Sequence, residues 1–105
     1  MNEMKDIAIY GAGGFGKEVA CLIKRINEKE PMWNLIGFFD DNPDKKGKTV
    51  SHFAPCLGGI DQLNAYPREL AVVMAMGNSH IAQKVVGKIH NGNISFPNLV
   101  DISFF

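Results

Sequence analysis

The fold is decided by residues 7–16, Ile7-Ala8-Ile9-Tyr10-Gly11-Ala12-Gly13-Gly14-Phe15-Gly16, in which a short β-prone run stops at a cluster of glycines. A continuous apolar run of this length is typical of a strand that is covered on both faces. From about residue 17 to residue 29, apolar side chains recur at the spacing of one helix face. We therefore expect a strand, a tight glycine turn and then a helix.

Strands and helices alternate along the rest of the chain. Residues 35–39 predict a second strand, and residues 71–76, the most apolar run, predict a third. A short helix is expected over 60–64 and a longer one from Asn78 or Ser79 to His90. The remaining segments are expected to form an exposed loop over 44–57, with one short edge strand around Thr49-Val50, and a last edge strand over 95–100 that Pro97 interrupts.

Strands that alternate with helices indicate a parallel sheet joined by right-handed crossovers. The expected fold class is α/β, a Rossmann-like half-fold (βαβαβ) with a mostly parallel sheet and helices on both faces. We expect residues 1–105 to form a single domain, because this length leaves no room for a second one of comparable size.

The composition excludes several classes of protein. Eleven basic side chains balance eleven acidic ones, so net charge does not recruit nucleic acid or an anionic membrane surface. No stretch approaches the roughly 20 apolar residues of a membrane span, and the N-terminus has no signal-peptide core. Two cysteines are too few for a disulfide framework. We expect a cytoplasmic protein.

The glycine cluster contains the pattern G-x-G-x-x-G between the predicted strand and the predicted helix. Gly11 permits the tight turn, Gly13 lets a ligand approach bare backbone, and Gly16 lets the helix pack closely on the strand. The unpaired N–H groups and the positive end of the helix dipole suit a phosphate group. The pattern therefore favours phosphate or nucleotide binding, and the alternative is a purely structural turn.

Two acidic residues, Asp40 and Asp41, directly follow the second predicted strand, where parallel sheets bind their ligands. One carboxylate would accept hydrogen bonds from ribose hydroxyls, and the other could meet a base edge. The alternative is a turn in which both carboxylates accept local backbone N–H groups.

The third predicted strand is followed by Gly77, Asn78 and Ser79, which we expect beside the glycine loop across a crevice. The Asn78 side chain either contacts a ligand or caps the following helix.

The sequence shows no catalytic constellation. None of the three histidines, His52, His80 and His90, has a nucleophile or an acid at a spacing that indicates a catalytic pair. No cluster has the spacing of metal ligands. We therefore predict no catalytic residue and no metal site in this chain.

Five separated motifs carry a resemblance to a known family. They are IYGAGGFGKEVA at 9–20, GFFDDN at 37–42, LGGIDQL at 57–63, AMGNSHIAQKVVGKI at 75–89 and FPNLVDIS at 96–103. In this order and spacing, the chain resembles the N-terminal domain of nucleotide-sugar acetyltransferases of the NeuD/PglD type, the sialic-acid O-acetyltransferase-like family.

The resemblance implies a Rossmann-like domain that binds a UDP-linked amino sugar. Asp40 and Asp41 would meet the uridine, and Gly77 and Asn78 would lie across the cleft. The loop residues implied in binding are Gly11, Ala12, Gly13, Gly14, Phe15 and Gly16, and their glycines would present backbone to the ligand. Many members have histidine where this chain has Phe15, a side chain that can neither exchange protons nor donate a hydrogen bond.

The resemblance also implies a larger enzyme. Family members continue into a left-handed β-helix of hexapeptide repeats, which forms a homotrimer, binds acetyl-CoA and carries the catalytic histidine. These 105 residues contain no hexapeptide repeat, so we expect this chain to bind the nucleotide-sugar without catalysing acetyl transfer and to hold no cofactor. The alternatives are an NAD(P)-binding half-domain of an oxidoreductase or redox sensor, and a module whose glycine loop is only a turn.

Overall fold

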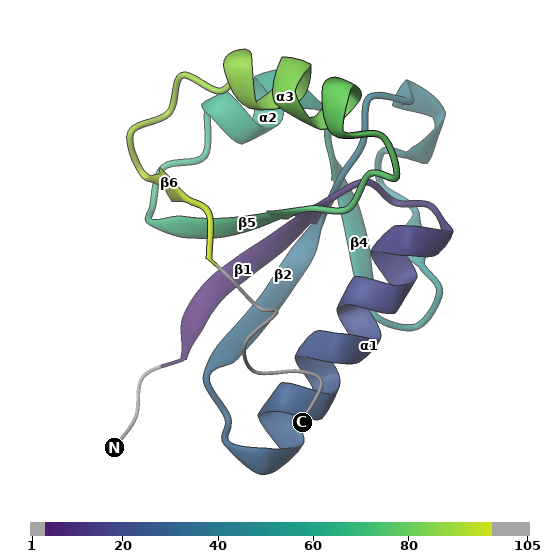
Figure 1. Cartoon of the computed structure of the whole chain (residues 1–105), viewed down its shortest axis with the longest axis vertical. Helices are drawn as coiled ribbons and strands as arrows, with labels where there is room; N and C mark the ends of the chain where they lie inside the picture. The colour runs from purple at the N-terminus through teal and green to yellow at the C-terminus, as the bar shows by residue number, and fades with distance from the viewer. Residues whose placement is uncertain (1–3, 98–105) are drawn as a thin grey trace.

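The structure is a computed structural model that describes residues 4–97 of the chain. Its elements alternate between strands and helices (Figure 1). In chain order they are β1 (Lys5–Tyr10), α1 (Gly14–Lys29), β2 (Trp33–Phe39), the 3-10 helix η1 (Pro43–Lys45), β3 (Thr49–Val50), β4 (Ala54–Gly58), α2 (Ile60–Asn64), β5 (Leu70–Met74), α3 (Ser79–Gly87) and β6 (Ile94–Ser95).

The strands form one sheet in the order β3-β4-β2-β1-β5-β6, with β1 near its centre. All neighbouring strands run parallel except β3 and β4, which pair antiparallel. Tyr10, the last residue of β1, is in register with Phe39 of β2 and with Met74 of β5. The carboxyl ends of these three strands therefore lie at the same edge of the sheet.

The residues of β1 alternate between two cores, one on each face of the sheet. Ile7 and Ile9 belong to the core that contains Ile23 of α1, whereas Tyr10 belongs to the core that contains Val85 of α3. Figure 1 shows α1 on one side of the strands and α2 and α3 on the other. The Rossmann-like α/β fold with helices on both faces is confirmed.

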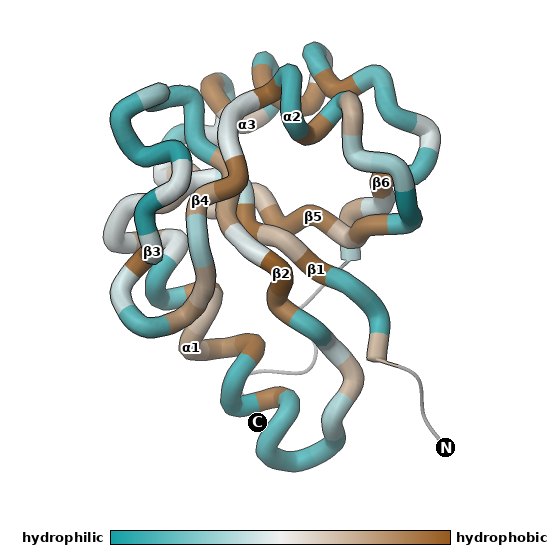
Figure 2. Tube along the Cα trace, turned by 180° about the vertical axis from the view of Figure 1, so that it is seen from behind, coloured by the Kyte–Doolittle hydropathy of each residue, from teal (hydrophilic) through white to brown (hydrophobic). Residues whose placement is uncertain are grey.

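Hydrophobic residues gather along β5 and the middle of β1 and β2, as Figure 2 shows, whereas the connection from α1 to β2 is mostly hydrophilic. The central strands have side chains of low exposure on both faces, which is typical of a sheet with helices on both sides. No helix in the described part of the chain combines the length and the apolar character that a membrane crossing requires.

Two helix boundaries differ from the sequence-based expectation. α1 begins at Gly14, three residues early, because the second half of the glycine cluster itself forms the first helical turn. α3 ends at Gly87 instead of His90. The side-chain amide of Asn64 binds the backbone just after this end of the helix. Its Nδ2 donates to the Lys88 carbonyl at 3.0 Å, and its Oδ1 accepts from the His90 N–H at 2.7 Å.

The predicted loop over 44–57 is wrong in its second half. Residues 54–58 form β4, a strand parallel to β2, in which Cys56 pairs with Phe38. The sequence hides this strand because it contains a proline and a glycine and has no β-branched residue. The expected edge strand at Thr49-Val50 is confirmed as β3.

The last strand, β6, lies at the sheet edge beside β5, as predicted, and begins at Ile94. The part of the predicted strand after Pro97 lies outside the described residues.

Candidate functional site

The candidate site lies where β1, β2 and β5 end together. The backbone ties these ends to one another directly after β1. The Gly11 N–H donates to the Phe39 carbonyl at 2.7 Å, and the Ala75 N–H donates to the Tyr10 carbonyl at 2.8 Å. The glycine loop, the acidic pair and the segment after β5 therefore start from the same edge of the sheet, where backbone hydrogen bonds join them.

Two glycines of the loop are required by the fold itself. Gly11 has a φ of +118°, and a Cβ atom at this position would lie 2.5 Å from the Ala75 carbonyl oxygen. A Cβ atom at Gly16 would lie 1.9 Å from the Gly11 carbonyl oxygen. These contacts explain the first and third glycines of the pattern without any ligand.

Gly13 and Gly14 are different, because a Cβ atom at either position would meet nothing within 4 Å. Both residues are exposed, and neither has a positive φ. Gly13 is the N-cap of α1, and no side chain within residues 4–97 caps this helix. The first turn of α1 therefore presents backbone N–H groups and the positive end of the helix dipole toward open space, an arrangement that suits an anion.

The other two loop residues occupy contrasting places. Ala12 is buried, and its N–H donates to Oδ2 of Asp40 at 2.8 Å. Phe15 is 47% exposed and lines a separate hollow of about 460 Å³ on the surface of α1, together with Cys21 and Leu22. Phe15 therefore lies on the surface of α1, whereas Ala12 is buried just after the end of β1.

Asp40 is held by donors from two directions. Its Oδ2 accepts from the Ala12 N–H and lies 3.6 Å from Nζ of Lys45, while its Oδ1 accepts from the Asn42 N–H at 2.9 Å. Burial alone would raise the pKa of this carboxyl, but the two N–H donors and Lys45 outweigh burial and lower the pKa below its ordinary value. Asp40 is therefore an ionised clamp between the end of β2 and the glycine loop.

Asp41 is exposed and has a different partner. The hydroxyl of Tyr10, a fully buried side chain, donates to Oδ1 of Asp41. Burial raises the pKa of Tyr10, and the hydrogen bond to Asp41 raises it further, so the phenol stays protonated and remains a donor. The Tyr10 ring stacks on Phe39 with a centroid distance of 6.4 Å.

A hollow of about 360 Å³ opens beside the acidic pair. It lies between the end of β2, the η1 helix and the start of α2. Its lining consists of Asp40, Asp41, Pro43, Lys46, Gly58, Gly59, Ile60, Asp61 and Gln62. A larger hollow of about 700 Å³ includes Lys5, Trp33 and Leu70, at the amino ends of the strands. Because open α/β sheets bind ligands at the carboxyl ends, we place the site at the smaller hollow.

Sequence reasoning missed the side of this hollow that β4 and α2 form. The segment Gly58–Gln62 reaches it because β4 lies beside β2, and the sequence did not reveal β4. The signal that could have found it is the glycine pair before a short helix, which repeats the strand–glycine–helix order of the first glycine loop.

Gly77 and Asn78 follow β5 and are both exposed. Oδ1 of Asn78 accepts from the His80 N–H at 2.9 Å and from the Ile81 N–H at 3.4 Å, so this side chain caps α3. The capping interpretation of Asn78 is therefore confirmed, and a ligand contact through its remaining amide N–H groups stays a prediction. A Cβ atom at Gly77 would meet nothing within 4 Å.

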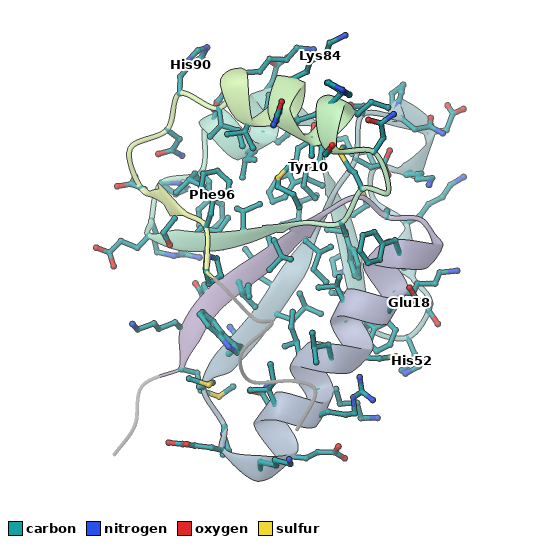
Figure 3. The ribbon with its side chains drawn as sticks, viewed as in Figure 1. Tyr10, Glu18, His52, Lys84, His90 and Phe96 are labelled. Carbon is teal, nitrogen blue, oxygen red and sulfur yellow. The ribbon has the colours of Figure 1, made fainter. Side chains whose placement is uncertain are left out.

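Figure 3 shows Tyr10 between the sheet and α3, whereas His52 and His90 lie far apart on the outside of the molecule. His52 packs against the neighbouring Phe53 ring with a centroid distance of 4.3 Å. The backbone N–H of His90 is bound by Asn64, an interaction that belongs to the end of α3. These two histidines therefore share no site.

Comparison with solved structures supports the same fold. The chain is similar to the acetyltransferase domain of PglB from Neisseria gonorrhoeae FA1090 in complex with acetyl coenzyme A, with 27% identity and a TM-score of 0.64, over 83% of this chain and 39% of that one. It therefore spans well under half of that relative's length.

Two further structures show the fold alone. RSP in complex with beta-NADH has 19% identity and a TM-score of 0.57, over 81% of this chain and 40% of that one. UDP-D-quinovosamine 4-dehydrogenase from Vibrio fischeri has 20% identity and a TM-score of 0.53, over 94% of this chain and 83% of that one.

The family comparison covers most of the chain. No curated protein matches the sequence. The family model of the PglD N-terminal domain, however, matches residues 6–89, which include the glycine loop, both acids and the Gly77–Asn78 turn. The chain belongs to the PglD N-terminal domain family.

Proposed function

We propose that this domain binds a UDP-linked amino sugar at the carboxyl ends of β1, β2 and β5. The observation that carries the proposal is the open backbone at Gly13 and Gly14, two glycines that the fold does not require. Glycine at such a position keeps a methyl group away from an approaching ligand. Membership of the PglD N-terminal domain family supports this choice of ligand.

The proposal assigns each part of the ligand to one part of the site. The diphosphate would accept hydrogen bonds from the N–H groups at the start of α1, where the helix dipole favours negative charge. The uridine would occupy the hollow that Asp41 and Lys46 line. Gly77 and Asn78 would meet the sugar from the end of β5. Phe15 offers only an apolar contact, since it has no polar atom in its side chain.

We further propose that the domain is the sugar-binding part of an acetyltransferase. The acetyl group would move from acetyl-CoA to an amine or hydroxyl of the bound sugar, in the cytoplasm. A C-terminal left-handed β-helix domain would bind acetyl-CoA and form the homotrimer. The similarity to the PglB acetyltransferase domain, of which this chain covers 39%, supports this larger arrangement.

Calorimetry tests the ligand class directly. The chain is titrated in parallel with UDP, UDP-N-acetylglucosamine, NAD and NADP, and we expect heat of binding from the two uridine ligands only. Gly13→Ala should weaken UDP binding about tenfold or more, because its methyl group stands in the path of the phosphate. Gly92→Ala is the matched control, since a Cβ atom there also meets nothing within 4 Å and the residue lies outside the site.

Two results would overturn the proposal. Binding of NAD without any response to UDP would indicate a dinucleotide-binding domain of an oxidoreductase or redox sensor. No response to any of the four nucleotides would leave the glycine loop as a structural turn.

A further inference from the structure

We infer that the two adjacent acids have different roles, with Asp41 accepting a hydrogen bond from the nucleoside and Asp40 holding the glycine loop. In this inference Tyr10 is a positioning residue that fixes the Asp41 carboxylate. The inference rests on the proposed function, because it assigns the acceptor for that ligand.

Asp40 has less capacity left for a ligand than Asp41, although it lines the same hollow, because both of its oxygens already accept hydrogen bonds. Its Oδ2 accepts from the Ala12 N–H at 2.8 Å and lies 3.6 Å from Nζ of Lys45, and its Oδ1 accepts from the Asn42 N–H at 2.9 Å. Its side chain is 18% exposed. A ligand that drew this carboxylate away would leave the N–H of the buried Ala12 without an acceptor, which is energetically costly.

Asp41 has the opposite character. It is exposed and lines the hollow beside Lys46 and Gly59. Within residues 4–97 its one hydrogen bond comes from Tyr10 and uses Oδ1. An ionised carboxylate accepts through both oxygens, so Oδ2 can accept from a ribose hydroxyl or a ring N–H.

Tyr10 is well suited to hold this carboxylate. Its side chain is fully buried and its ring stacks on Phe39 at an interplanar angle of 15°, so the position of its hydroxyl is fixed by the core. Among the hydrogen bonds of residues 4–97, the Tyr10 hydroxyl has Asp41 as its partner. A rigid donor beneath an exposed acceptor reduces the conformational entropy that the acceptor loses when a ligand binds.

A purely structural interpretation makes a different prediction. If Asp41 served only to satisfy the buried Tyr10 hydroxyl, then removing that hydroxyl together with its hydrogen bond would leave ligand affinity unchanged. Tyr10→Phe makes this change while keeping the ring and its stacking on Phe39.

The test is a double-mutant cycle on UDP affinity, measured by calorimetry on the full chain. We expect Asp41→Asn to weaken UDP binding by about tenfold and Tyr10→Phe by about threefold. The double variant should bind as weakly as Asp41→Asn alone, because Tyr10 acts through Asp41. Inorganic pyrophosphate, which lacks the nucleoside, should bind Tyr10→Phe and the wild type equally.

Contrary results distinguish failure of the inference from failure of the proposed function. Wild-type affinity for UDP in Tyr10→Phe or Asp41→Asn overturns the inference, as do losses that multiply in the double variant or weaker pyrophosphate binding in Tyr10→Phe. A wild-type chain that binds no UDP overturns the proposed function and the inference with it. Thermal unfolding of each variant confirms that the folded state is being compared.

Discussion

The strand ends on the two sides of β1 are built differently. After β2, Asp40 accepts from the N–H of Ala12 in the glycine loop, and its own N–H donates to the Gly58 carbonyl at 2.8 Å. After β5, the Asn78 side chain accepts only from the first turn of its own helix, among the hydrogen bonds of residues 4–97. Asp40 therefore joins three strand ends, whereas the Asn78 side chain binds only within its own helix.

This difference separates residues whose contacts the fold itself requires from positions that leave open space for a ligand. The contacts of Asp40 after β2, and those of Gly16 in the glycine loop that Asp40 holds, are internal, and the structure explains both residues without a ligand. At Gly77, and also at Gly13, the space around the backbone is open. The end of β2 is therefore defined by internal contacts, whereas the backbone at Gly77 has open space beside it.

The largest effect is expected from one added methyl group in the glycine loop that Asp40 holds, compared with one added after β5. Gly16→Ala should destabilise the domain by about 3 kcal/mol or more, because the new Cβ lies 1.9 Å from a backbone oxygen that cannot move alone. Gly77→Ala, whose Cβ meets nothing within 4 Å, should change stability by no more than about 0.5 kcal/mol. Urea unfolding measures both values.

The sign of the Gly16 effect is informative, since alanine normally stabilises a helix relative to glycine by about 1 kcal/mol. Gly16 lies inside α1, so a simple helix-propensity effect would make Gly16→Ala more stable than the wild type. Equal or greater stability of this variant would contradict the close contact with Gly11.

The Asp40 clamp predicts a smaller effect that depends on pH. Asp40→Asn should cost about 1–3 kcal/mol at pH 7, because the amide loses the charge that strengthens the bonds from Ala12 and Asn42. The pKa of Asp40 is lowered in the folded state. Its contribution to stability is therefore present above the unfolded pKa of about 3.9 and is lost as pH falls through the lower, folded value.

Urea unfolding at a series of pH values below 5 measures this contribution. The wild type should lose more stability than Asp40→Asn as the pH falls. Asp44→Asn, at an exposed carboxylate of η1, is the control and should follow the wild type. An Asp40→Asn variant that is as sensitive to acid as the wild type would show that the clamp does not stabilise the fold.

The sequence predicted the elements whose signals are local. The apolar run before the glycines forms β1, as predicted. The cap at Asn78 also depends on neighbouring residues, and it is one of the two roles that the sequence left open for this side chain. The alternative of a turn with local backbone donors at Asp40 and Asp41 is met only by the bond from the Asn42 N–H to Asp40. β4 was missed because its pairing with β2 depends on residues far away in sequence, and its own residues favour a strand only weakly.

The roles within the candidate site could be predicted only in part. The sequence predicted that Asp40 and Asp41 lie at one strand end. It could not show which carboxylate binds the glycine loop and which binds Tyr10. That distinction rests on the bond between Ala12 and Asp40, which spans 28 residues, and on the one between Tyr10 and Asp41, which spans 31. Such contacts follow from the strand order, and only the three-dimensional structure reveals them.

The smallest and most local loss of stability is expected for a substitution after β5. Asn78→Ala removes the cap of α3 and should cost about 1 kcal/mol. Hydrogen exchange should quicken at the His80 and Ile81 amides, which lose their acceptor, and should stay unchanged at Ala12. Asp40→Asn should give the reverse pattern, with faster exchange at Ala12 and none of the change at α3. If Asn78→Ala also loosened the Ala12 amide, then the two strand ends would be coupled through β1, and the cap of α3 would not act independently of the clamp.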